Sequence, residues 1–201
     1  MFLLIIIFFT PFLVRSLYEK VALTKIGEVE ISGSLFDVDL ETNYAYVSEY
    51  SASRVHIIDI SDPMNLLEIG NFTVNLPHYF EVENAIAYIA AWNQGVQIFN
   101  VSNPNSPYKM SEFRPGIVGA LTVQDNFLFV GSEEGFNIID ISNLVLPENL
   151  SYFYTGGNVH DFFVIESLLY IMTWNSTSDS SWIKIFNITN PEQPEELVNL
   201  F

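Results

Sequence analysis

The stretch VHIID at residues 55–59 recurs in related form three more times, and this recurrence decides the fold. Each copy has apolar residues around a central isoleucine and ends on Asp or Asn. The other copies are VQIFN at 96–100, FNIID at 136–140 and IKIFN at 183–187. Their terminal Asp or Asn residues are 41, 40 and 47 residues apart. A repeat of nearly fixed period indicates a repeat architecture.

A second series of residues keeps the same register. An aromatic residue between aliphatic neighbours recurs at steps of 42, 41 and 41, as Tyr46, Tyr88, Phe129 and Tyr170. The two series divide the chain into four units, 33–73, 74–114, 115–155 and 156–201.

Each unit reads as four short strands. In the second unit, runs of β-branched and aromatic residues between turn formers predict strands at 78–82, 85–91, 96–101 and 108–113. Gly95 and Gly135 lie where the second hairpin turns, so we expect a positive φ at both. After the third strand, a short polar side chain is expected to accept a hydrogen bond from the backbone two residues on, at Asp59, Asn100, Asp140 and Asn187.

The first strand of every unit carries matching apolar columns. One column is Val38, Phe80, Leu121 and Phe162, and a second lies two residues later in each unit. A single four-stranded sheet cannot bury both of its faces, whereas sheets stacked around an axis cover one another. We therefore predict an all-β, β-propeller-type array of four four-stranded blades, with an incomplete or open ring as one of its forms.

The third-strand marker, followed by Asn-Pro-x-x-Pro at 103–107 and 190–194, resembles the LVIVD repeat over residues 21–201. The resemblance implies a propeller-type repeat of exported and surface proteins. It implies no particular reaction, because that family is defined by its architecture.

The N-terminus is strongly apolar. Residues 1–16 begin MFLLIIIFFTPFLV, which is too short for a comfortable membrane span and typical of a signal peptide. We expect a secreted or cell-surface protein. An uncleaved anchor that leaves the propeller outside the membrane is the alternative, and it is the only membrane contact that the sequence predicts.

Residues 17–32 resemble the outermost strand of the later units, so they are expected to be the orphan strand of a preceding blade. The prediction leaves exposed blade edges, which favour pairing with other strands. Self-association through these edges, or membership of a split or truncated larger propeller, follows as a hypothesis.

Composition narrows the classes of partner. The chain has 24 Asp and Glu against 7 Lys and Arg, a net charge of −17, and no cysteine. Such a charge repels phosphate backbones, so we expect no nucleic-acid partner. Disulfides and thiolate metal sites are excluded. No cofactor-binding fingerprint or catalytic motif is present, and no catalytic residue is predicted.

Three kinds of candidate site remain. His78 and His160 share a repeat column and, with Asp161, are weak candidates for a metal site, although packing is the better interpretation. Trp92, Trp174 and Tyr50 are candidates for an aromatic binding rim. Three sequons are candidates for glycosylation, at Asn175, Asn71 and Asn149, and Asn175 is expected to be the most exposed.

The leading functional hypothesis is a non-catalytic extracytoplasmic interaction or scaffold module with a protein or glycan partner. A hydrolase-like or metal-dependent enzyme with its site at the channel mouth is the alternative from another class.

Overall fold

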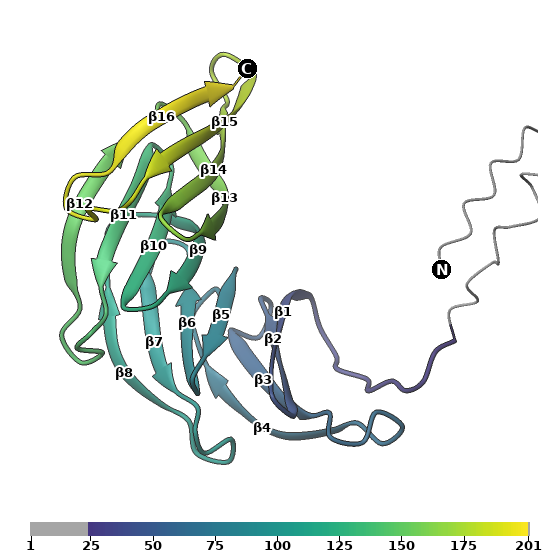
Figure 1. Cartoon of the computed structure of the whole chain (residues 1–201). Coiled ribbons are helices and arrows are strands. Elements are labelled where there is room, and N and C mark those ends of the chain that lie inside the picture. Colours follow the sequence, from purple (N-terminus) through teal and green to yellow (C-terminus); the bar gives the residue numbers. More distant parts are fainter. Residues whose placement is uncertain (1–23, 201) are drawn as a thin grey trace, which may run out of the picture.

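The protein is described by a computed structural model over residues 24–200, which contain β-strands and no helix (Figure 1). Accordingly, this part of the chain has no helix that is long and apolar enough to cross a membrane. The expected signal peptide or anchor, residues 1–16, lies outside the described residues.

Sixteen strands form four antiparallel four-stranded sheets, and within each sheet the strands are neighbours in chain order. We call the sheets blades one to four. Blade one holds β1 (Leu35–Glu41), β2 (Tyr44–Glu49), β3 (Arg54–Asp59) and β4 (Leu67–Thr73), and blade two holds β5 (Phe80–Glu83), β6 (Ile86–Ala90), β7 (Val96–Asn100) and β8 (Tyr108–Phe113). Blade three holds β9 (Val118–Gln124), β10 (Phe127–Ser132), β11 (Gly135–Asp140) and β12 (Glu148–Tyr154), and blade four holds β13 (Asn158–Ile165), β14 (Leu168–Asn175), β15 (Ser180–Asn187) and β16 (Glu195–Leu200). The predicted array of four four-stranded sheets is confirmed.

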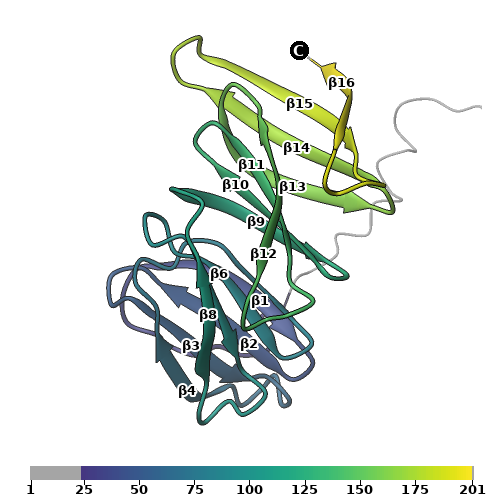
Figure 2. The ribbon, with the colours of Figure 1, turned by 90° about the vertical axis from the view of Figure 1, so that its left-hand side faces the viewer.

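The hydrophobic core lies between blades. Three clusters of buried side chains are found, one at each junction between consecutive blades. The first joins Tyr46 and Ile57 of blade one to Phe80 and Ile89 of blade two. We call the side of a blade that is oriented toward the preceding blade its entry face, and the side oriented toward the following blade its exit face. Figure 2 shows the sheets stacked in this way.

Short polar turns follow the third strand of every blade, as predicted. The four Asp or Asn side chains accept hydrogen bonds from the backbone N–H two residues on, over 2.7 to 3.1 Å, at Asp59, Asn100, Asp140 and Asn187. The hydrogen bonds from Ser61 and Ser142 lower the pKa of Asp59 and Asp140. These side chains thus hold turns and are not free for chemistry.

Side chains of the innermost strands reach from one blade to the backbone of the next. Asp37 accepts a hydrogen bond from the Phe80 N–H at 3.1 Å, and Glu81 accepts one from the Val123 N–H at 2.9 Å. The strand β5 N–H groups would otherwise face the interior of the arc without a partner. No sign of this role is visible in the sequence, because the backbone partners lie in the next blade.

The outermost strands make a second contact between blades. The hydroxyl groups of Ser111 and Ser151 donate to carbonyl oxygens of the next blade, those of Leu144 and Pro191. Gly70 stands in the same position of blade one, where a Cβ atom would overlap the carbonyl oxygen of Pro104. This position accepts only a small residue, because a backbone turn of the following blade lies against it.

Of the two glycines expected to have a positive φ, one does. Gly95 has a φ of 77°, whereas Gly135 belongs to strand β11 and has no positive φ, so that expectation was wrong. Gly135 instead lies so close to the carbonyl oxygen of Phe153 that a Cβ would overlap it. A close backbone approach, and not a turn, explains this glycine.

The four blades form an arc whose first and last blades lie at opposite ends (Figure 1). Residues 24–34 form no strand. The outermost strand predicted over residues 17–32 lies partly outside the described residues, which begin at residue 24. An outermost strand pairs with the third strand of its own blade. No such strand lies beside residues 24–34 in the described part of the chain, so their backbone has no sheet to join.

Candidate functional site

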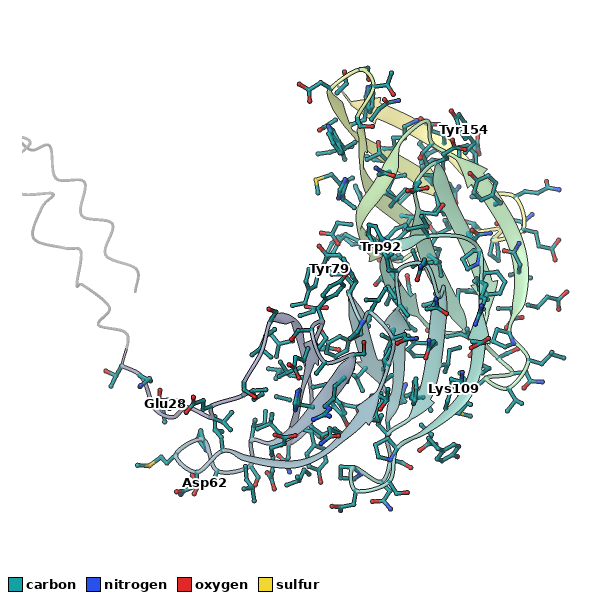
Figure 3. The ribbon with its side chains drawn as sticks, turned by 180° about the vertical axis from the view of Figure 1, so that it is seen from behind. Glu28, Asp62, Tyr79, Trp92, Lys109 and Tyr154 are labelled. Carbon is teal, nitrogen blue, oxygen red and sulfur yellow. The ribbon has the colours of Figure 1, made fainter. Side chains whose placement is uncertain are left out.

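A hollow lies at one end of the innermost strands. It is a groove of about 240 Å³ that runs from blade one across to blade four. Its lining is aromatic and apolar on the side of blades one and two, with Phe36, His78, Tyr79 and Trp92. The side of blades three and four adds polar groups, among them Ser132, Glu133, Asn158 and His160. Figure 3 shows Tyr79 and Trp92 close together on the concave side of the arc.

His78 is the centre of the aromatic half. Its ring stacks on Trp92, with a centroid distance of 4.8 Å and an interplanar angle of 27°. Phe36 and Tyr50 approach the same imidazole at 4.4 and 5.4 Å. Burial lowers the pKa of His78, so the neutral imidazole is the favoured form at pH 7. The four rings form a packed aromatic wall, which we call the aromatic cluster (Phe36, Tyr50, His78 and Trp92).

The backbone of Trp92 holds its side chain at the groove under strain. The residue has a φ of 47°, a conformation that bulky side chains rarely adopt. It is kept there because its carbonyl oxygen accepts hydrogen bonds from the N–H groups of Val118 and Gly95. The indole remains 39% exposed. Strained residues whose surroundings fix them in place are concentrated at functional sites, which makes Trp92 the strongest single candidate here.

A second, more polar hollow of about 360 Å³ adjoins the first on the side of blades three and four. It shares Glu133 and Asn158 with the first groove and is also lined by Glu134, Tyr154 and Trp174. Trp174 packs against His160 at 6.0 Å. Both glutamates are exposed, so the two hollows together offer aromatic faces beside free carboxylates.

The predicted rim residues are thus partly brought together. Tyr50 and Trp92 meet around His78, whereas Trp174 lies in the neighbouring hollow. Sequence reasoning did not single out Glu133 and Asn158 as lining residues. Glu133 lies in the turn between β10 and β11 and Asn158 begins β13, and only the packing of blades three and four brings them together.

The weak metal candidates lack a full set of ligands. Among residues 24–200, no group of three or more His, Asp or Glu side chains is placed to hold a metal ion. His78 is packed among aromatic rings, and Asp161 accepts a hydrogen bond from the Phe162 N–H at 2.9 Å. His78 and Asp161 are therefore engaged in packing and in a backbone hydrogen bond, respectively.

A polar cluster in blade one was not anticipated. The buried ring of His56 lies 3.1 Å from Glu49 through Nε2 and 2.9 Å from Glu68 through Nδ1. The hydrogen bond from His56 lowers the pKa of Glu49. The equivalent residues of the other blades are also polar and buried, namely Gln97, Asn137 and Lys184. The signal for this column is the variable second letter of the repeat marker.

One of the three sequon asparagines differs from expectation. Asn175 was predicted to be the most exposed, but it is half-buried and its amide donates to the carbonyl oxygen of Gly156 at 2.6 Å. The Asn175 side chain lies against the Gly156 turn, which explains its partial burial. Asn71 and Asn149 are exposed on the outermost strands β4 and β12.

The fold places this chain among proteins built from propeller-type repeats. The sequence model of the LVIVD repeat matches residues 32–74, 82–114 and 115–154, and the chain belongs to this family. A search of curated proteins finds no match to this chain.

Solved structures share the fold at low sequence identity. The computationally designed Ika4 protein aligns with a TM-score of 0.65 and 9% identity, covering 83% of this chain and 98% of Ika4. A protein from Lactobacillus plantarum aligns with a TM-score of 0.71 and 13% identity, covering 82% of this chain and 54% of that one. A hypothetical selenium-binding protein from Sulfolobus tokodaii aligns at 0.65 and 12%, covering 83% and 55%. The chain therefore spans about half the length of these two natural structures.

Proposed function

We propose that this chain is a non-catalytic extracytoplasmic binding module, and that its groove takes a basic segment of a protein partner. The observation that carries the proposal is Trp92, an exposed indole held in a strained conformation beside Tyr79 at the edge of the groove. The apolar start of the chain supports export.

The chemistry of the lining favours a cationic ligand. Faces of tryptophan and tyrosine attract ammonium and guanidinium groups. The exposed carboxylates of Glu133 and Glu134 lie beside those faces, and the net charge of −17 attracts the same ligands from a distance. An anionic ligand would meet repulsion at every one of these groups.

Titration of residues 17–201 with hexa-arginine, followed by tryptophan fluorescence, tests the proposal. We expect saturable binding that Trp92→Ala weakens about tenfold, which corresponds to about 1.4 kcal/mol. Binding should weaken as salt is added, because the attraction is electrostatic.

Matched controls separate the groove from general acidity. Trp182→Ala removes an indole from strand β15, outside both hollows, and should leave the affinity unchanged. Glu133→Gln should weaken binding more than Glu148→Gln, which removes an exposed carboxylate from strand β12. Equal effects of the two tryptophan variants would contradict the proposal. If neutral chito-oligosaccharides quench the tryptophan fluorescence and hexa-arginine does not, the ligand is a glycan and not a basic peptide.

A further inference from the structure

The two ends of the arc expose what the junctions between blades bury. On the entry face of blade one, Val38 and Leu40 are 60% and 62% exposed, whereas their equivalents Phe80 and Val82 are 6% and 7% exposed. The exit face of blade four likewise exposes Phe163, Ile165, Met172 and Ile183. Exposed apolar faces of this kind mark interaction surfaces.

From the match between these two faces we infer that the chain forms a head-to-tail dimer, in which the exit face of blade four packs on the entry face of blade one of a second copy. The dimer does not depend on the proposed groove ligand.

The sizes of facing side chains complement each other at this junction. On the exit face of blades one to three, the residue two positions after the second-strand aromatic is small: Ser48, Ala90 or Gly131. The entry-face residue of the following blade is large: Phe80, Leu121 or Phe162. The Phe162 ring lies against Gly131. In the proposed junction the large side chain, Met172, is on the exit face and the smaller one, Val38, is on the entry face. The two side chains together can therefore fill the junction, with their sizes exchanged between the faces.

Hydrogen bonding is also matched. Blades one and two send carboxylates to the next blade, from Asp39 and Glu81, but blade four has Phe163 in this position. Its partner strand must therefore manage without such an acceptor. Strand β1 does so, because the N–H groups of Val38 and Leu40 bond to the side chains of the residues directly before them, at 2.9 and 2.8 Å.

An internal junction already shows this arrangement. Blade three has Ala120 where blade one has Asp37, and the N–H of Phe162 beside it is bonded to its own neighbour Asp161 at 2.9 Å. Blades three and four nevertheless pack through a continuous apolar core. A blade whose innermost strand bonds an N–H group to the side chain of the preceding residue can thus still form a tight junction.

Residues 24–31 already lie where the outermost strand of the docked blade would be. A Cβ at Gly27 would overlap the carbonyl oxygen of Pro63, just as a Cβ at Gly70 would overlap that of Pro104. Figure 3 shows Glu28 near the turn that carries Asp62. Strand β16 has Val198 opposite Ile185, in the place where β4 has Gly70 opposite Ile57. The other blades have glycine or serine in this place, which are smaller than valine, so we expect residues 24–31 to take it in the dimer and to displace β16 of the partner.

Two copies are the number that this geometry favours. A head-to-tail contact closes into a ring when its rotation allows, and otherwise continues into a filament. The four blades span about half of two natural structures of the same fold, so two arcs account for one propeller of that size.

Analytical ultracentrifugation of residues 17–201, which hold all four blades, tests the inference. We expect a dimer at 100 μM that Val38→Asp and Met172→Asp each convert to monomer. Both side chains are largely exposed in the single chain, so the variants should keep the same far-UV spectrum. Leu146→Asp is the control, because Leu146 is 76% exposed on a turn outside both faces and its loss should leave the dimer intact.

A mixing experiment identifies the head-to-tail geometry. Equal amounts of the Val38→Asp and Met172→Asp variants should form a heterodimer, since one unaltered entry face still meets one unaltered exit face. Exchanging the sizes of the two facing side chains is a second check. Val38→Phe alone and Met172→Gly alone should weaken the dimer, and the double variant should restore it by copying the pair Phe162 and Gly131. A wild-type monomer at every concentration, or a dimer indifferent to Val38→Asp, would overturn the inference.

Discussion

The carboxylate of Asp39 in strand β1 accepts a hydrogen bond from the backbone N–H of Val82 in strand β5, at 2.6 Å and 43 residues further along the chain. The bond crosses the junction between blades one and two, where Val82 is buried. It joins the unpaired edge of one sheet to a side chain of another, and it is the kind of contact on which the packing of blades depends.

Replacing Asp39 by alanine should lower the free energy of unfolding by about 1–3 kcal/mol, because the buried Val82 N–H is left without an acceptor. Asp39→Asn keeps a carbonyl oxygen in the same place and should cost less. Urea unfolding followed by circular dichroism measures both. Equal losses for the two variants would show that the hydrogen bond contributes nothing.

Asp37 and Glu81 should give stability a dependence on pH. Burial raises the pKa of both carboxyl groups above their usual values of 3.8 and 4.5. Folding then favours the protonated forms, so their contribution is fully present below these values and is lost as the pH rises through the folded-state pKa. Compared with the Asp37→Asn/Glu81→Gln variant, the wild type should be relatively more stable at pH 4 than at pH 7. Thermal unfolding at the two pH values tests the sign.

Glu49 should show the opposite sign. The hydrogen bond from His56 lowers its pKa below 4.5, so the stabilising contribution is present above that value and is lost as the pH falls through the folded-state pKa. Glu49→Gln should therefore destabilise the protein at pH 7, and the difference from wild type should shrink at pH 3.5. A difference that stays constant between these pH values would exclude the charge of Glu49 as its cause.

Gly70→Ala should destabilise the junction between blades one and two by about 1–3 kcal/mol, because the added methyl group overlaps the backbone of Pro104. Gly119→Ala is the matched control. A Cβ at Gly119, in strand β9, has no neighbour closer than 3.8 Å, so we expect the stability of this variant to be unchanged or slightly raised. Chemical unfolding of the two variants provides the comparison.

The repeat architecture was predictable because it rests on local signals. The marker that ends at Asp59, the proline turns and the apolar columns all repeat at one period, and the structure confirms the four sheets and the hydrogen-bonded turns. The contacts between blades were not predictable in the same way. Asp37 and Glu81 look like solvated acids in the sequence, and only the position of the next blade reveals their backbone partners.

The candidate site was predictable only in part for a related reason. Trp92 and Tyr50 stand out as aromatic residues near strand ends, but their meeting around His78 depends on how two blades pack. Gly135 shows a similar limit of prediction from the sequence. The need for a glycine was visible, whereas the Phe153 carbonyl oxygen that requires it lies on a neighbouring strand.

The side-chain carboxylates that join blades one, two and three all point the same way along the chain, each from an earlier blade to a later one. A gene duplication that adds one such unit would therefore copy the acceptor together with the strand that needs one. The new unit would meet its neighbours with both halves of the bond already encoded, which gives a physical route by which proteins of this kind can lengthen without inventing a new interface.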